Sequence, residues 1–321
     1  MLMNDTDTLQ IGLSWLQQGH HIVLATVIRT WGSSPRQAGA HMVIRDDGVF
    51  AGSVSGGCIE NAVIQHVLDG FEGVGKQLFF GVSTETAWEV GLSCGGEIEI
   101  WLESIDQDLL QIILDAIHSR KSSAIEFFVD GSQNMRLLDT KIPSQQYRTL
   151  IQTDGRIIRS YEPSFRIFVV GAVHIAQFLI TFAKDVGYEV IVIDPRDIFV
   201  HADRWSGVRT SNLFPEECFE QEQLGIYDAV VALSHNPNFD DEAMLCALKQ
   251  NTFYVGALGS KKNHASRCQR LRDMGCSQEE LDKICGPIGL DIGSKTPAEI
   301  AISILAEIIS HQRKLCKKIS I

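Results

Sequence analysis

The residues best suited to chemistry form one short run at positions 52–60, GSVSGGCIE. A strand pattern precedes the run and the apolar spacing of a helix face follows it, so we expect a strand-to-helix loop. Glycines let the backbone approach a ligand, and the free amides at a helix start suit an anion such as phosphate. The candidate ligand-binding residues here are Gly52, Ser53, Ser55, Gly56, Gly57 and Cys58.

Two residues of this run carry groups that could react. Cys58 falls in the first helical turn, where the helix field favours thiolate over thiol. Glu60 falls there too, where it stabilises the helix but opposes a bound anion. The candidate catalytic groups are therefore Cys58 and Glu60, together with Cys94 of a second loop, and the pattern assigns no catalytic role to any of them.

The second loop, GLSCGGE at 91–97, repeats the same letters in another order and contains Cys94. It lies between expected strands at 76–80 and 98–102. We interpret the two loops as a pair that faces one pocket. The alternative is two glycine-rich turns that each carry a small buried cysteine. A third polar stretch at 30–37 contains Arg36, which either faces the same ligand or belongs to a plain surface turn.

Bulk composition excludes several classes of protein. The chain has 321 residues, 45% of them hydrophobic, which is enough for about two domains with ample core. Its net charge of -12 argues against nucleic acid or anionic membrane as the main partner. The N-terminus lacks the order of a signal peptide, so we expect a cytoplasmic protein. Eight scattered cysteines without a CxxC pair argue against structural disulfides and a tetrahedral zinc site.

The chain is predicted to contain two domains of different character. Residues 1–140 alternate short strands and helices, which indicates an α+β domain. Turn residues accumulate at 141–163, which we interpret as a linker. From 164 to 321 buried strands alternate with helices, beginning with the apolar run IFVV at 167–170, as in a parallel sheet. The predicted fold class is α/β, with a Rossmann-like, doubly wound C-terminal domain.

Polar residues gather after the strands of this second domain. Asp194 lies 23 positions after Gly171, where a dinucleotide-binding fold places its ribose-binding acid, but Val173 replaces the glycine that lets pyrophosphate approach. Lys261 follows a glycine loop at a helix start, and either holds a phosphate or is simply solvated. The candidate cofactor-binding residues here are Gly171, Ala172, His174, Asp194, Arg196, Gly259, Ser260 and Lys261.

The sequence resembles the xanthine dehydrogenase accessory factor family, also called XdhC/CoxI. The resemblance is carried by GSVSGGCIE, LSCGGEIEI, VGAVHIA, VIDPR, YVGALGSKK and GPIGLDIGSKTPAEIAISILAEI, which span nearly the whole chain in order. It implies a dimeric cytoplasmic chaperone. Such a chaperone binds the molybdenum cofactor, protects it while a cysteine desulfurase adds sulfur, and inserts it into a molybdenum hydroxylase apoenzyme.

Molybdopterin, in its plain or nucleotide-extended form, needs close backbone amides and soft ligands. Cys58 and Cys94 would supply the thiolates, either as transient molybdenum ligands or as carriers of persulfide sulfur; no other metal site is expected. The competing hypothesis is an NAD(P)-dependent oxidoreductase whose second domain binds the nucleotide. Val173 counts against that alternative.

Overall fold

The computed structural model describes residues 5–31, 36–57, 59–71, 75–81, 96–128, 136–139, 149–151, 156–200, 205 and 207–318. The chain divides into two compact units between Pro163 and Ser164. Cys58 and Cys94 lie outside the described residues. The predicted fold class is confirmed, because an α+β unit is followed by a unit built on a parallel sheet.

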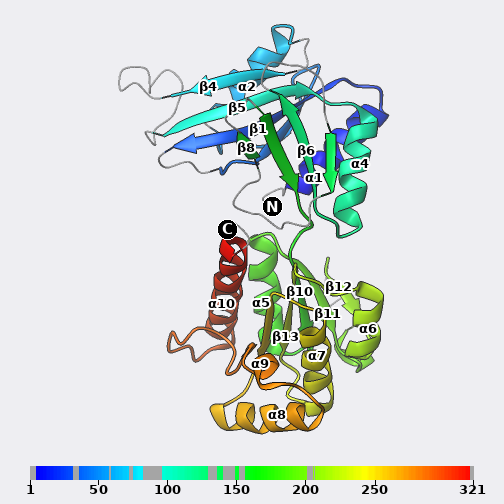
Figure 1. Ribbon diagram of the computed structural model, residues 1–321, viewed down its shortest axis with the longest axis vertical. Helices are drawn as coiled ribbons and strands as arrows, with labels where there is room; N and C mark the ends of the chain where they lie inside the picture. The colour runs from blue at the N-terminus through cyan, green and yellow to red at the C-terminus, as the bar shows by residue number, and fades with distance from the viewer. Residues whose placement is uncertain are drawn as a thin grey trace. The chain divides into compact units, whose positions relative to one another are not determined.

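The first unit is built on a five-stranded antiparallel sheet of order β3-β2-β1-β5-β4 (Figure 1). Its strands are β1 Ile22–Trp31, β2 His41–Arg45, β3 Phe50–Gly52, β4 Lys76–Phe80 and β5 Glu97–Ser104. Helices α1 (Asp5–Gln17) and α4 (Gln107–His118) bury apolar residues against one face. Helix α2 (Glu60–Leu68) covers the other face through Val63 and Val67, together with its N-cap residue Ile59.

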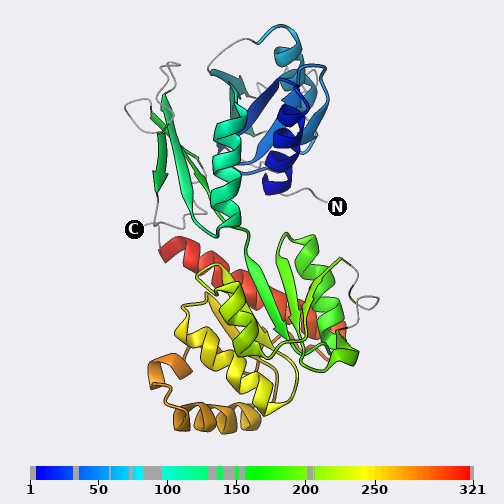
Figure 2. The same cartoon turned by 90° about the vertical axis from the view of Figure 1, so that its right-hand side faces the viewer.

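A second antiparallel sheet, of order β7-β6-β9-β8, belongs to the same unit. Its strands are β6 Ser123–Phe128, β7 Arg136–Asp139, β8 Thr149–Ile151 and β9 Arg156–Tyr161. Figure 2 shows α4 between this sheet and α1, and Ile125 and Ile157 join the core that α4 covers. The interpretation of 141–163 as a linker is therefore corrected, since β8 and β9 are paired strands of the first unit.

A buried ion pair connects the two sheets of the first unit. Arg159 on β9 and Glu103 on β5 are 0% and 1% exposed and form a hydrogen-bonded salt bridge. Arg159 Nη1 also donates to Thr26 Oγ1 on β1 over 3.0 Å. A buried charge is tolerated only when it is paired, so this contact fixes how β9 lies on the larger sheet.

The second unit is a parallel sheet of order β12-β11-β10-β13-β14-β15. Its strands are β10 Arg166–Val170, β11 Glu189–Ile193, β12 Arg209–Ser211, β13 Asp228–Ala232, β14 Tyr254–Ala257 and β15 Ile284–Cys285. Strand β10 lies at the centre, and the chain proceeds first to one side of it and then to the other. This reversal is the switch point beside which doubly wound proteins bind ligands.

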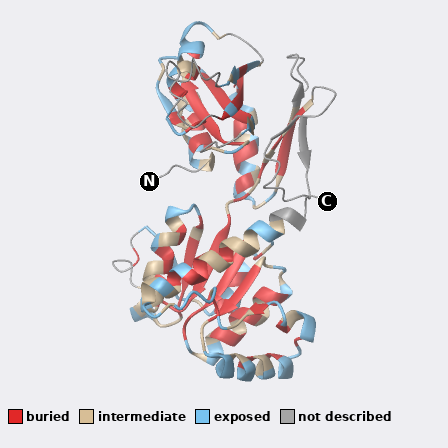
Figure 3. Cartoon of the chain, turned by 90° about the vertical axis from the view of Figure 1, so that its left-hand side faces the viewer, coloured by how far each residue is buried: buried red, intermediate tan, exposed pale blue. Residues whose placement is uncertain are grey.

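Helices cover both faces of this sheet, and Figure 3 shows the strands between them as buried. Along β10, Ile167 and Val169 face α5 (His174–Asp185) and α10 (Pro297–Lys318). Phe168 and Val170 face the opposite layer. That layer consists of α6 Pro215–Glu222, α7 Pro237–Lys249, α8 Lys261–Asp273 and α9 Gln278–Leu281. Burial on both faces explains why β10 is a continuous apolar run.

Candidate functional site

The loop at 52–57 leaves β3 through a glycine that no other residue could replace without strain. Gly52 has a φ of +83°, and a Cβ on it would lie 2.4 Å from the carbonyl oxygen of His41. Arg36 holds the loop from outside, because its Nε donates to the Ser53 carbonyl over 3.0 Å and its Nη2 to Asp5 over 3.0 Å. Arg36 therefore supports the loop through the Ser53 carbonyl.

Glu60 is the centre around which this loop is organised. One carboxylate oxygen accepts the Ser53 hydroxyl at 2.7 Å and the amides of Val54, Ser55 and Gly56 at 3.2, 2.9 and 3.1 Å. The other accepts the Ser55 hydroxyl at 2.5 Å and the amides of Gly57 and Ile59 at 2.9 and 3.2 Å. The carboxylate thus lies in a ring of backbone and hydroxyl donors.

These contacts determine the charge state of Glu60. Burial raises the pKa of the carboxyl, but the hydrogen bonds from Ser55 and Ser53 outweigh it and lower the pKa from 4.5 to about 2. Glu60 is therefore ionised at neutral pH and supplies the anion that these donors attract. The loop amides that we expected to attract a phosphate therefore donate to the side chain of Glu60, and binding of the cofactor by this loop stays a prediction.

The loop nevertheless presents backbone at the surface. Gly56 and Gly57 are exposed although their amides are held by Glu60, whereas Ser55 is buried. The residues on either side of Cys58 are both anchored, because Gly57 and Ile59 each donate an amide to the same carboxylate oxygen. The expected meeting of Cys58 with Cys94 falls outside the described residues and stays a prediction.

In the second unit, the turn after β10 packs tightly on the turn after β13. Gly171 has a φ of +103°, and a Cβ on it would lie 2.6 Å from the backbone of Ser234. Gly171 and Ala172 are buried, whereas His174 is exposed at the first residue of α5, with its ring 5.4 Å from that of Phe178. Of these three candidates, only His174 presents a side chain to solvent.

The carboxylate of Asp194, the candidate ribose ligand, already accepts hydrogen bonds from other residues of the second unit. Its Oδ2 accepts the Ala172 amide at 2.9 Å, and Arg196 donates to both of its oxygens at 2.8 and 2.7 Å. Burial raises the pKa of Asp194, but the hydrogen bonds from Arg196 and Ala172 outweigh it and the net shift is downward. The side chain is 0% exposed and connects the two turns, and its expected contact with a ribose stays a prediction.

The third group of candidates lies at the end of β14. Ser260 is the N-cap of α8 and accepts the Asn263 amide at 3.2 Å, and both it and Lys261 are exposed. Beside this helix start lies a pocket of about 260 Å³, lined by His235, Pro237, Asp240, Leu258, Asn263, Ser266, Arg267 and Arg270. The structure thus places Gly259 and Ser260 beside a concave site.

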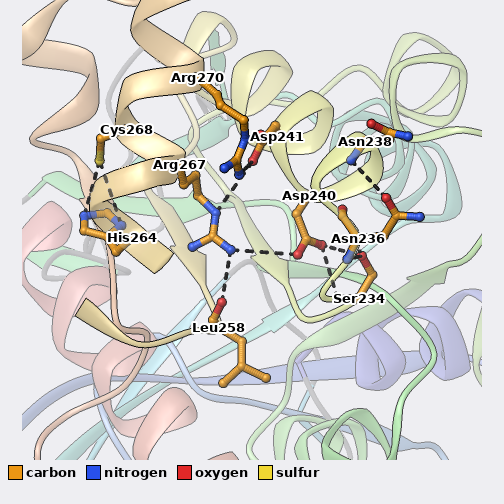
Figure 4. A network of polar contacts seen from close by, with 10 residues as sticks. All are labelled: Ser234, Asn236, Asn238, Asp240, Asp241, Leu258, His264, Arg267, Cys268 and Arg270. Atoms are coloured by element: carbon orange, nitrogen blue, oxygen red, sulfur yellow. Dashed lines mark hydrogen bonds and ion pairs between the residues drawn. The ribbon is translucent and has the colours of Figure 1, made fainter. Parts of the chain in front are cut away.

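Sequence reasoning missed two residues of this pocket, Asp240 and Arg267. Both are buried, and Figure 4 shows the Arg267 guanidinium between α8 and the carboxylates of Asp240 and Asp241. One signal was available: Arg267 and Leu271 are four positions apart, so they share a helix face. They are the buried residues of α8, which means that its inward face contains an arginine.

Two properties of the described residues limit the chemistry. Within the described part of the chain, no group of three or more His, Cys, Asp or Glu side chains could hold a metal ion. In the same part, none of the helices is both long and apolar enough to cross a membrane.

The fold and these loops define a two-unit protein, with a cysteine-containing α+β unit followed by a Rossmann-like unit. Residues 15–80 match the family model "XdhC and CoxI family", and residues 167–308 match "XdhC Rossmann domain". The chain belongs to the XdhC and CoxI family.

Proteins similar to this chain match it along nearly its whole length. It is 29% identical to the molybdenum cofactor insertion chaperone PaoD of Escherichia coli (strain K12), over 95% of this chain and 89% of that protein. It is 28% identical to a probable xanthine dehydrogenase subunit of Bacillus subtilis (strain 168), over 94% of this chain and 96% of that protein. A crystal structure described as a xanthine dehydrogenase from Bacillus halodurans has a TM-score of 0.76 at 25% identity, over 97% of this chain and 96% of that one.

Proposed function

We propose that this protein is a cytoplasmic chaperone that binds the molybdenum cofactor, protects it during sulfuration and inserts it into a molybdenum hydroxylase apoenzyme of the xanthine dehydrogenase type. The observation that carries the proposal is the end-to-end similarity to a protein named as a molybdenum cofactor insertion chaperone, which covers both units. The similarity to a probable xanthine dehydrogenase subunit supports the same class of client.

The geometry of the Glu60 loop supports a role for Cys58. A soft thiolate suits molybdenum or a transferable sulfur, and it acts best from a fixed backbone. Glu60 anchors the residues on both sides of Cys58, and the adjoining glycines are exposed, so a planar pterin could approach the backbone closely. In this proposal the loop amides do not bind the cofactor phosphate, because they already bind Glu60.

The primary test is whether the protein carries the cofactor when it is purified from cells that make it. The full-length protein is isolated quickly, its molybdenum is measured by mass spectrometry, and the released pterin is identified by its fluorescence and mass. We expect both in a fixed ratio to protein, and the mass distinguishes the plain from the nucleotide-extended form. A preparation that contains neither would overturn the proposal.

A second test addresses the cysteines. We expect Cys58→Ser and Cys94→Ser to lower the activity of the client enzyme matured in the same cells. Cys246→Ser is the matched control, because burial raises the pKa of Cys246 to about 11 and keeps it a protonated thiol. Normal maturation with both loop variants together would remove the proposed role of these thiols.

The proposal also names partners. A cysteine desulfurase should bind the cofactor-loaded protein, and the protein should be a homodimer. Co-purification with a tagged desulfurase and light scattering after size-exclusion chromatography test these two expectations separately. A monomeric mass would remove the dimer without affecting cofactor binding.

A further inference from the structure

The pocket at the start of α8 contains a buried cation that is short of hydrogen bonds. The side chain of Arg267 is only 7% exposed. Its Nη2 donates to the Leu258 carbonyl over 3.0 Å, but Nε and Nη1 are buried and none of the described residues is a hydrogen-bond partner for them. A guanidinium has five N–H donors, and each buried donor without a hydrogen-bond acceptor costs free energy.

The nearby carboxylates do not accept hydrogen bonds from these two donors of Arg267. Arg267 lies 3.9 Å from Asp240 Oδ2 and 3.7 Å from Asp241 Oδ1, which are ion-pair distances beyond hydrogen bonding. Asp241 already binds Arg270, and Asp240 Oδ1 accepts the Ser234 hydroxyl at 2.7 Å (Figure 4). The two carboxylates balance the charge of the arginines but leave Nη1 of Arg267 available as a donor.

The backbone of Gly259 lies close to that donor. Gly259 has a φ of +149°, and the nearest groups to a Cβ built on it are Asn263 at 3.3 Å and Arg267 Nη1 at 3.8 Å. Gly259 therefore lies next to the guanidinium of Arg267, at the point where the chain enters α8. The first-turn amides of this 13-residue helix and its dipole add a field that favours negative charge in the same place.

We propose that this pocket binds the phosphate group of a small phosphomonoester, with Arg267 Nη1 as its principal donor. The volume of about 260 Å³ suits a phosphate and part of the group that carries it rather than a whole dinucleotide. Asp240 lies on the pocket wall, and its Oδ2 would accept a hydroxyl of the carrier, such as that of a sugar. The residue that binds the phosphate is thus the buried Arg267 and not the exposed Lys261.

This inference concerns the second unit alone and does not depend on the proposed function. Its test is direct ligand binding, whereas the proposed function is tested by the cofactor content of the purified protein. Phosphate binding by a protein that carries no molybdenum would support the pocket and reject the chaperone, and the reverse result would do the opposite.

The experiment is calorimetric titration of the full-length protein with ribose 5-phosphate, inorganic phosphate and ribose. We expect ribose 5-phosphate to bind most tightly, inorganic phosphate more weakly, and ribose not at all. Arg267→Met should weaken binding of both phosphates by about tenfold or more, because it removes a charge-assisted hydrogen bond. Arg272→Met is the matched control on the same helix, since Arg272 is exposed and binds Gln269 and Gln278 outside the pocket.

A second variant covers the case in which Arg267→Met does not fold. Asn263 is exposed and lines the pocket, so Asn263→Leu should obstruct it without disturbing the buried guanidinium. We expect unchanged thermal stability and weakened phosphate binding. The proposal is overturned if the wild-type protein binds neither phosphate, if ribose binds as tightly as ribose 5-phosphate, or if the folded variants bind like the wild type.

Discussion

Glu60 accepts both the hydroxyl and the backbone amide of Ser55, at 2.5 and 2.9 Å, so that one carboxylate organises the loop that leads into its own helix. The loop is consequently built around an internal anion.

Replacing this carboxylate should destabilise the first unit. In Glu60→Gln, several loop amides would lose a charged acceptor and face an amide group, and we expect a loss of about 3 kcal/mol in the free energy of unfolding. Urea denaturation followed by circular dichroism measures it. Asp69→Asn is the control, because Asp69 is exposed and should change stability by less than about 0.5 kcal/mol. Equal stability of the two variants would contradict the role of Glu60.

The same contact predicts a pH dependence. The pKa of Glu60 is about 2 in the folded protein against an ordinary value of 4.5, so its contribution to stability is fully present above about pH 4.5. It is lost as the pH falls from 4.5 towards 2, because the unfolded chain takes up the proton first. The difference in stability between wild type and Glu60→Gln should therefore shrink over this window. A difference that stays constant down to pH 3 would argue against the shift.

Gly171 should tolerate no side chain. Gly171→Ala combines a left-handed backbone with a Cβ 2.6 Å from the Ser234 backbone, so we expect a loss of about 3 kcal/mol or more in the free energy of unfolding. Gly187→Ala provides the comparison, because it has a φ of +92° and nothing within 4 Å of the new Cβ. That variant should lose only about 1 kcal/mol. Denaturation of both variants separates steric contact from backbone strain.

The second unit should not bind nicotinamide nucleotides tightly. Asp194 is held by Ala172 and Arg196 and is 0% exposed, so a ribose would have to displace an existing salt bridge. Titration with NADH, followed by its fluorescence, should show no saturable binding at micromolar concentration. Tight binding that is lost in Asp194→Ala would favour the oxidoreductase alternative instead.

The sequence predicted the parallel sheet well, because strands buried on both faces read as apolar runs such as that of β10. It failed at 141–163, where β8 has only three residues and β9 buries a polar side chain, Arg159, that no apolar pattern marks. The two-residue strand β15 was too short to give a signal.

The candidate site was predicted less completely than the fold. The Gly52–Glu60 loop, Gly171 and Gly259 were identified because glycines mark special backbone. The roles of Glu60 and Arg267 depend on which atoms their charged groups reach in three dimensions, and residue type and spacing do not specify that.

The salt bridge between Arg159 and Glu103 has a practical consequence for dissecting the chain. A fragment that ends at residue 140 would lack the arginine that balances the buried charge of Glu103, a loss that costs about 3–5 kcal/mol where the carboxylate stays buried. An autonomous N-terminal piece must therefore retain β9, and Pro163 is the earliest sensible place to cut.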